Sequence, residues 1–393
     1  MPAHRDVLVV GAGIAGCATA YFLRRRGFHV TLLDPNGPGW GASGRNPGFL
    51  WLQTKAAGTQ MGFALAARQF AERFADEIGD ESFRTCGGLI VYRDSECKSV
   101  ADAFAADRNK AGLPVQHLDA HDVHERCPQL GPAIIGGIWN PLDAHQDTPN
   151  LCRKVVARLS DLGVDCRFGT GIASLILKGE QCIGVRTTDG EDLHSDRTVL
   201  CAGPWSTALA PELNLGKSLI PMRFEAACTS PANFRIDPVV AGQSLFRFFT
   251  AEGVDESMTP LHRLEREHPD LGFTEQFASM PNGSIRYGCA FQDSDSDAST
   301  AAGQKLGRGV LEDNLPVLRG LATDRSWAGI VLRTPDGLPI IDIDCGVPGL
   351  ALNTGHFFGN LAGPISGMMI ADAIAGAETP YPMTPFSRRR FSA

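Results

Sequence analysis

Two glycine-rich segments near opposite ends of the chain have residue types that could hold negatively charged groups. The first, GAGIAG at residues 11–16, lies between an apolar run and an amphipathic stretch, and the second, NTGHFFGNLAGP at residues 353–364, leads into the apolar run ISGMMIADAIAG. Both patterns are typical of a loop that begins a helix, where free backbone N–H groups attract negative charge. The sequence therefore predicts two anion-holding helix starts and raises the question of whether one ligand uses both.

The first segment has the spacing of a dinucleotide-binding fingerprint. Residues 6–34 have the pattern of a strand, a helix and a second strand, which is the unit that this fingerprint requires. Gly11 permits a tight turn, Gly13 lets the backbone approach a pyrophosphate, and Gly16 lets the helix pack closely on the strand. Asp34, at the end of the second strand, is placed to accept a hydrogen bond from a ribose hydroxyl. The motif predicts a dinucleotide and does not by itself separate NAD from FAD.

A second glycine-rich loop, GASGRNPG at residues 41–48, follows the second strand. Its small residues leave backbone N–H groups open to a phosphate, and Arg45 and Asn46 add side-chain donors. The apolar continuation FLWL is not typical of a flexible surface loop. We therefore expect this loop to contact the same cofactor.

This loop and three further segments resemble motifs of the D-amino-acid-oxidase-like FAD-dependent oxidoreductases, a family that includes glycine and sarcosine oxidases, D-amino acid dehydrogenases and γ-glutamylputrescine oxidases. The further segments are RTVLCAGPWS (197–206), WAGIVLRTPDGLPIID (327–342) and LALNTGHFFGNLAGPISGMMIADAIAG (350–376), and all four occur in the family's order. The resemblance implies bound FAD. It also implies noncovalent binding, because the Cys that tethers flavin in monomeric sarcosine oxidases would align near Gly329.

The resemblance also gives both helix starts a role on one long cofactor, the first at the pyrophosphate and the second at the pyrimidine end of the flavin. A helix N-terminus there favours the reduced, anionic flavin. Phe357 and Phe358 stand where the family motif TGHGG has glycine after its His. They either form an apolar wall beside the flavin or belong to the core. The implied cofactor-binding residues are Gly11, Ala12, Gly13, Ile14, Ala15, Gly16, Asp34, Pro35, Ala42, Ser43, Arg45, Asn46, Pro47, Gly48, Ala202, Gly203, Trp205, Gly355, His356, Phe357, Phe358, Gly359, Asn360 and Leu361.

The candidate catalytic residues lie where the chain departs from the family pattern. Many amino-acid oxidases of the family carry a carboxylate-binding Arg where this chain has Val331, and Arg333, on the same face of an expected strand, is our candidate for that role. Arg286 stands where sarcosine oxidases place a Lys near flavin N5, and it keeps the positive charge but cannot release its proton. His356 is the third candidate. The missing Arg favours an amine over a simple α-amino acid as substrate.

The periodic segments predict an α/β fold with a discontinuous Rossmann-like FAD-binding domain and an inserted α+β substrate domain built on a mixed or antiparallel sheet. We assign residues 1–85, 145–220 and 326–393 to the FAD-binding domain and residues 86–144 and 221–325 to the substrate-binding domain. We also expect a helix at 59–78, a helical region at 100–127, a small β-meander over 164–205 and a strand at 244–250.

Composition narrows the class of protein further. A chain of 393 residues, 43% hydrophobic and 20% charged, can bury a large core, and a net charge of -8 argues against a nucleic-acid partner. The 11 cysteines without a C-x-x-C indicate reduced thiols, and the 10 histidines show no metal-ligand spacing, so we expect no metal. No apolar stretch reaches membrane-spanning length. We expect a soluble, cytoplasmic protein that acts on a small molecule, and the sequence leaves open whether it forms a homo- or hetero-oligomer.

These observations lead to the hypothesis that the protein oxidises the C–N bond of an amine or amino-acid-like substrate by hydride transfer to flavin N5, after which the imine is hydrolysed. Oxygen, or a quinone or electron-transfer partner, would reoxidise the flavin. Two alternatives keep the fold: an FAD-dependent 2-hydroxy acid dehydrogenase, and a flavin-bearing subunit of a hetero-oligomeric dehydrogenase. An enzyme that uses NAD alone leaves the loop at 41–48 and the C-terminal helix unexplained.

Overall fold

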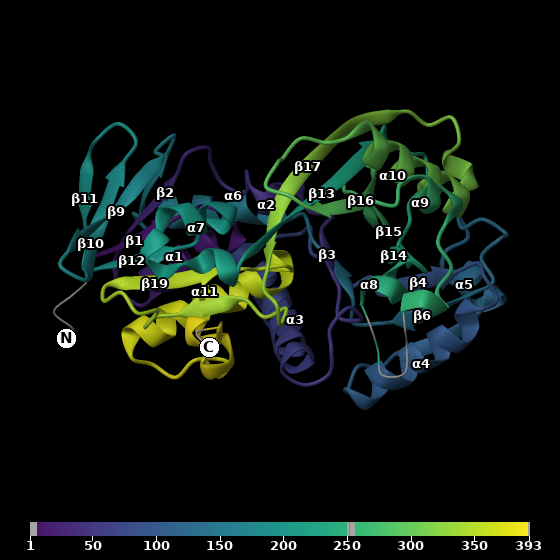
Figure 1. Cartoon of the computed structure of the whole chain (residues 1–393), viewed down its shortest axis with the longest axis horizontal. Helices are drawn as coiled ribbons and strands as arrows, with labels where there is room; N and C mark the ends of the chain where they lie inside the picture. Colours follow the sequence, from purple (N-terminus) through teal and green to yellow (C-terminus); the bar gives the residue numbers. More distant parts are fainter. Residues whose placement is uncertain (1–5, 250, 252–255, 392–393) are drawn as a thin grey trace.

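The structure, a computed structural model, describes residues 6–249, 251 and 256–391. They form two halves that lie side by side, each built on one large sheet (Figure 1). The chain passes between the halves several times, because residues 88–140 and 220–333 supply the strands of the second sheet. The fold is α/β, and the predicted discontinuous arrangement is confirmed.

A six-stranded sheet forms the first half, and every neighbouring pair in it is parallel except that of β18 with β19. Helices pack on one face, and a three-stranded antiparallel sheet packs on the other. Strand β1 shows the division, because Val7 and Val9 belong to the core under the helices whereas Leu8 and Val10 face the small sheet. In sheet order the strands are β18 (Ile340–Asp342), β19 (Leu350–Thr354), β12 (Arg197–Leu200), β1 (Asp6–Val10), β2 (His29–Asp34) and β8 (Asp165–Phe168); the small sheet holds β9 (Ile172–Lys178), β10 (Gln181–Thr187) and β11 (Asp192–His194); the helices are α1 (Ile14–Arg25), α3 (Thr59–Ile78), α6 (Thr148–Asp161) and α11 (Gly359–Ala375).

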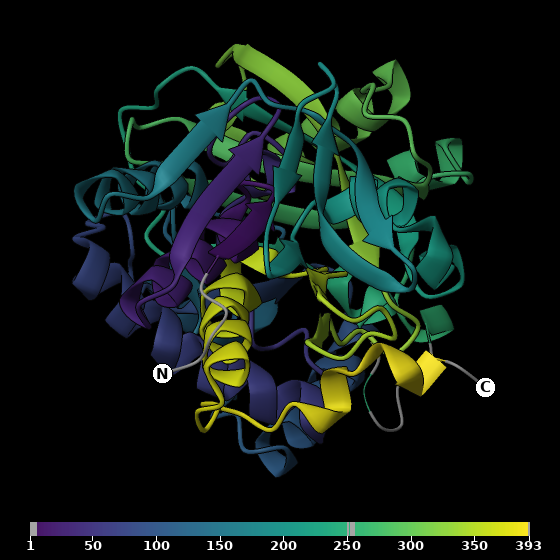
Figure 2. The ribbon, with the colours of Figure 1, turned by 90° about the vertical axis from the view of Figure 1, so that its left-hand side faces the viewer.

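The closest helix packing in this half joins α1 to α11, so the two predicted helix starts belong to neighbouring helices (Figure 2). A Cβ on Gly367 would lie 2.6 Å from the backbone nitrogen of Thr19, so the two backbones approach within a distance that only glycine permits. At the far end of α1, Arg26 Nε donates to the buried Asp372 carboxylate at 2.7 Å. The sequence thus brings its two glycine-rich helix starts to one side of the first half.

The second half is an eight-stranded mixed sheet, in which β14 pairs with β4 in parallel and the other neighbouring pairs are antiparallel. Its core on one face includes Leu89, Phe277, Tyr287 and Leu311. In sheet order the strands are β17 (Thr323–Arg333), β13 (Ile220–Thr229), β16 (Ile285–Asp293), β15 (Gly272–Ser279), β14 (Val239–Gly242), β4 (Gly88–Tyr92), β6 (Gly136–Asn140) and β5 (Gln116–Asp119); the helices are α4 (Cys97–Lys110), α5 (Ala120–Arg126), α8 (Leu245–Phe248), α9 (Arg263–Glu267) and α10 (Ala301–Asn314).

Several local expectations need correction. The meander predicted over 164–205 is limited to β9, β10 and β11, because β8 and β12 join the parallel sheet. Strand β5 interrupts the helical region predicted at 100–127, and the expected strand at 244–250 contains helix α8. Strand β17 pairs with β13 in the second half although it lies mostly in the segment assigned to the FAD-binding domain, and the domain boundaries stay a prediction.

Two searches of the described residues bear on the protein's class. None of the helices in that part of the chain is long and apolar enough to cross a membrane. Nor do the described His, Cys, Asp and Glu side chains form a group of three or more that could hold a metal ion.

Candidate functional site

Two positions in the turn between β1 and α1 have no room for a side chain. Gly11 has a φ of +106°, and a Cβ there would lie 2.4 Å from the carbonyl oxygen of Cys201. A Cβ on Gly16 would lie 1.8 Å from the carbonyl oxygen of Gly11. Both positions therefore require glycine, and the turn presents bare backbone at the start of α1. Such a cradle fits a pyrophosphate.

The Asp34 carboxylate is held in place beside this turn. Its Oδ2 accepts the backbone N–H of Ala12 at 2.8 Å, and its Oδ1 accepts those of Asn36 and Gly37 at 2.8 and 2.9 Å. A carboxylate has about four acceptor positions, so one is left for a ribose hydroxyl. Pro35 lies in the same turn.

The predicted phosphate loop folds as the short helix α2 (Ala42–Arg45) against the start of α1. Ser43 Oγ accepts the backbone N–H of Ile14 at 3.0 Å, which joins the two segments. The Arg45 guanidinium lies 4.2 Å from the ring centroid of Trp40. The bare backbone, the hydroxyl and the guanidinium are donors for phosphate oxygens, so these residues fit FAD.

The turn after β12 lies beside both the turn that begins α1 and the phosphate loop. Gly203 has a φ of +52°, and Trp205 is 49% exposed, with its ring centroid 6.2 Å from that of Trp40. Ala202 is the residue before Gly203 and is half-buried. The segments at residues 11–16, 41–48 and 202–205, which are all predicted to contact the cofactor, therefore lie together.

Arg286 lies behind the phosphate loop and is buried. Its Nη1 donates to the carbonyl oxygen of Asn46, and its Cζ lies 5.3 Å from the ring centroid of Trp327. The Trp327 indole N–H in turn donates to the carbonyl oxygen of Arg45 at 2.9 Å. Arg286 therefore holds the loop from the side of the second sheet and does not line the cavities described below.

The side chains of Arg333 and Val331, both on strand β17, have different surroundings. Arg333 Nη2 donates to Asp293 Oδ2 at 2.8 Å, and its side chain is 35% exposed and lines neither cavity. Val331, two residues earlier on β17, does line the main cavity. The position at which the family carries its Arg thus points into the cavity, and Arg333 does not.

The main cavity lies between the phosphate loop, the start of α11 and one face of the second sheet, and it spans roughly 700 Å³ outside the protein atoms, part of which is open to solvent. Seven aromatic side chains contribute to its lining, and the rings of Phe224, Phe248, Phe249, Phe357 and Phe358 form a continuous cluster. The full lining is Ala42, Arg45, Asn46, Pro47, Phe49, Trp51, Phe224, Ala226, Phe248, Phe249, Thr274, Gln276, Cys289, Gly329, Val331, Phe357, Phe358 and Asn360. Phe357 and Phe358 thus form an apolar wall of the main cavity, and they are not confined to the core.

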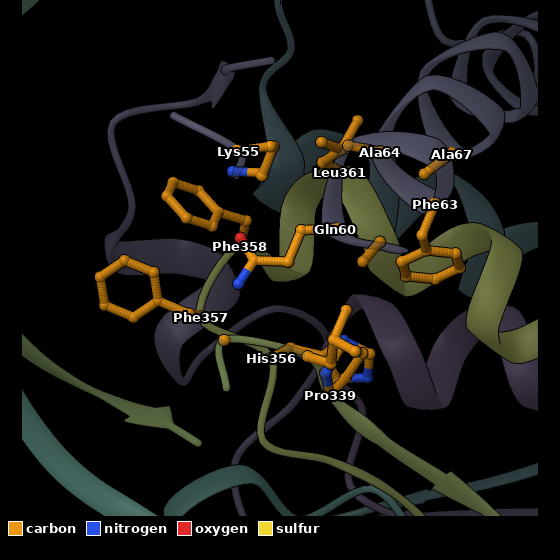
Figure 3. A pocket seen from close by; sticks show the side chains of 13 residues that line it. Lys55, Gln60, Phe63, Ala64, Ala67, Pro339, His356, Phe357, Phe358 and Leu361 are labelled. Carbon is orange, nitrogen blue, oxygen red and sulfur yellow. The ribbon is translucent and has the colours of Figure 1, made fainter. Parts of the chain in front are cut away.

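A second, smaller cavity, which spans roughly 390 Å³ including space open to solvent, lies behind that wall (Figure 3). Phe357 and Phe358 line both cavities, and Lys55, Gln60 and His356 line the second. Lys55 Nζ lies 2.9 Å from the ring centroid of Phe358 and donates to Thr54 Oγ1 at 2.7 Å. Burial lowers the pKa of Lys55 well below its ordinary value.

His356 is a neutral, fixed imidazole. Its Nε2 hydrogen-bonds to Asn353 Oδ1 at 2.7 Å, and Asn353 Nδ2 donates to Thr19 Oγ1 at 3.1 Å. Because an amide oxygen only accepts, Nε2 carries the proton and Nδ1 is a bare acceptor, which is buried and has no partner among the described residues. Burial lowers the pKa of His356 to about 4. His356 therefore does not donate a second proton near neutral pH.

His145 is a second buried imidazole, behind the phosphate loop and edge-on to Phe49 at 6.2 Å between ring centroids. Neither ring nitrogen makes a well-formed hydrogen bond with the described residues, and the nearby backbone of Pro47 offsets the effect of burial only in part. Burial, reinforced by the charge of Arg84, lowers its pKa from 6.5 to about 3. The folded protein therefore holds His145 without its proton where the unfolded chain would bind one.

We expect this to make the protein acid-sensitive. The folded state has its full stability with respect to His145 above pH 6.5. This stability is lost as pH falls towards 3, because His145 then binds a proton in the unfolded chain but not in the folded protein. The loss is on the order of 3 kcal/mol at about pH 4. His145→Phe removes the titrating group, so its melting temperature should change less between pH 6.5 and about 4 than that of the wild type. The exposed His194→Phe is the matched control, and equal slopes for all three proteins would contradict the expectation.

Sequence reasoning missed several residues of the site. Trp51 and Lys55 follow the phosphate loop in the segment FLWLQTK, and its apolar start FLWL is a local signal that this segment is buried. Phe224, Phe248 and Phe249 gave no local signal, because long-range pairing of the second sheet brings them to the cavity.

The fold and the site define a dinucleotide-binding flavoprotein oxidoreductase whose main cavity lies against a mixed sheet. The chain belongs to the family described as FAD dependent oxidoreductase (DAO), whose model matches residues 6–373. The predicted family, cofactor FAD and enzyme class are thereby confirmed.

Individual relatives agree with this assignment. Glycine oxidase of Pseudomonas aeruginosa is 25% identical over 97% of this chain and 99% of its own length. The bifunctional protein ThiO/ThiG of Trichormus variabilis is 28% identical over 98% of this chain, which spans 55% of that longer protein. The crystal structure of glycine oxidase from Bacillus cereus superimposes with a TM-score of 0.82 at 21% identity, covering 98% of this chain and 99% of that one. The structural likeness at this identity shows the shared fold.

Proposed function

We propose that the protein oxidises the C–N bond of an amine or amino-acid-like substrate. The observation that carries this proposal is the lining of the main cavity, whose ionisable members among the described residues are Arg45 and Cys289. Burial raises the pKa of the Cys289 thiol to about 12, so neither group takes up a proton near neutral pH. An alcohol that loses a hydride needs a base for its hydroxyl proton, whereas a neutral amine does not. The lining therefore favours an amine over a 2-hydroxy acid.

The residues of the cavity would position the substrate and exclude water. FAD, when bound, supplies the hydride acceptor. The aromatic cluster would hold the apolar part of the substrate. Gln276 Nε2 donates to Thr274 Oγ1 at 2.9 Å, so its Oε1 is free of the described residues and can accept an amine N–H. In this arrangement positioning provides most of the catalytic effect.

The proposal is tested by mixing the holoenzyme anaerobically with matched pairs of compounds, each pair an amine and an alcohol on the same carbon skeleton. We expect the visible absorbance of the bound flavin to bleach with at least one amine and not with its alcohol partner. Admitting air then separates an oxidase, which recovers its colour at once, from a dehydrogenase that needs another acceptor. Bleaching by 2-hydroxy acids alone would overturn the proposed substrate class.

A further inference from the structure

We propose that Lys55 binds a carboxylate of the substrate in the second cavity, so that the enzyme acts on amines that carry a carboxylate beyond an apolar spacer. This inference rests on the proposed function and assigns its substrate class. It begins from a buried basic side chain, without an anionic partner, that the oxidation of a simple amine does not require.

Lys55 lacks an anionic partner. It is 7% exposed, and its ammonium contacts the Thr54 hydroxyl and the face of the Phe358 ring. No carboxylate oxygen of the described residues lies within 4.0 Å of Nζ. A buried ammonium is costly unless it is paired, so a site of this kind gains strongly from an arriving anion.

The nearby charges do not replace that partner. The Asp143 carboxylate attracts Lys55, and the guanidinium of Arg108 repels it. Asp143 already accepts the backbone N–H of Leu52 at 2.6 Å and Gln53 Nε2 at 2.7 Å. Burial raises the pKa of Asp143 to about 7, so this carboxyl carries only part of a charge near neutral pH. Lys55 therefore has an unmet preference for negative charge.

The position of Lys55 relates this preference to the substrate. Its ammonium points at Phe358, whose ring forms part of the wall between the two cavities (Figure 3). In the main cavity Val331 stands where a cation could have been, and Arg333 is bound to Asp293. Among the described residues that line the two cavities, Lys55 is therefore the buried basic side chain that has no anionic partner. A substrate that reaches it must cross the aromatic wall, which calls for an apolar spacer.

The test measures ligand binding to the oxidised holoenzyme, with no turnover. Phenylacetate and its uncharged analogue phenylacetamide are titrated while the visible flavin spectrum and the heat of binding are followed. We expect Lys55→Met to weaken phenylacetate binding by about tenfold or more and to leave phenylacetamide unchanged, because a charge-assisted hydrogen bond is lost. Lys55→Arg should keep most of the preference for the carboxylate, and the exposed Lys98→Met should match the wild type.

Other results would overturn the inference. Equal weakening of both ligands would make Lys55 a structural residue or a modulator of the flavin, and unchanged phenylacetate binding would remove it from the site. If Lys55→Met does not fold, Lys55→Arg and Lys55→Gln give the same comparison. Failure of the proposed function is distinguishable, because it appears as the absence of amine bleaching in the wild type whatever the carboxylate selectivity.

Discussion

Gly13→Asp is expected to give a folded protein that purifies without FAD. Gly13 is the N-cap of α1 with φ −68° and ψ 173°, a conformation open to any residue, and a Cβ there would meet only Ser43 Oγ, at 3.2 Å. Asp is a favourable N-cap residue, so the helix itself should gain stability. The new carboxylate would stand where the pyrophosphate binds, and two like charges about 4 Å apart repel by roughly 4 kcal/mol near a protein surface, about a thousandfold in affinity.

The measurement is the ratio of flavin to protein after purification, with the FAD dissociation constant of the reconstituted protein and the melting temperature of the apoprotein. Gly13→Asn is the matched control, because it has the same size and capping ability without the charge. We expect Asn to weaken FAD binding far less than Asp. Equal losses would show that size and not charge excludes the cofactor, and full flavin content in Gly13→Asp would refute this location of the pyrophosphate.

The cofactor half could be predicted from the sequence because its signals are local. The glycine spacing at 11–16 and the position of Asp34 lie within one strand–helix–strand unit, and the structure forms that unit as β1, α1 and β2. The helix expected at 59–78 is α3, which begins and ends at those residues. In these segments the periodicity of the chain and its contacts agree, so pattern alone was sufficient.

The second half could not be predicted in the same way because its sheet joins strands that are distant in sequence. Strand β4 pairs with β14 and β6, so one sheet holds residues 88–92 beside residues 239–242. The aromatic segment 244–250 predicts a strand, but helix α8 forms there, and Phe248 at its end and Phe249 directly after it line the main cavity. Arg333 has the spacing of a cavity residue, and a single partner, Asp293, decides its direction instead. Such outcomes depend on tertiary contacts that no local pattern contains.

Val331→Arg is expected to give the enzyme an added preference for amino acids whose carboxylate is close to the amine. Val331 is half-buried and lines the main cavity beside Phe224 and Phe357, so a guanidinium there could rest on their rings while it meets a carboxylate. A hydrogen-bonded charge pair contributes about 1.5 to 3 kcal/mol, which corresponds to an increase in kcat/KM of about tenfold to hundredfold.

The comparison is made with Val331→Met, which has similar length and no charge, on glycine, D-alanine and the same amines without the carboxyl group. A selective gain in kcat/KM for the amino acids in Val331→Arg, absent from Val331→Met, would show that this position faces the reacting end of the substrate. Because Lys55 lies behind the aromatic wall, the two cations would select carboxylates at different distances from the amine. An equal loss on acids and amines would mean that the added bulk merely fills the cavity, and the position would then shape the site without choosing its charge.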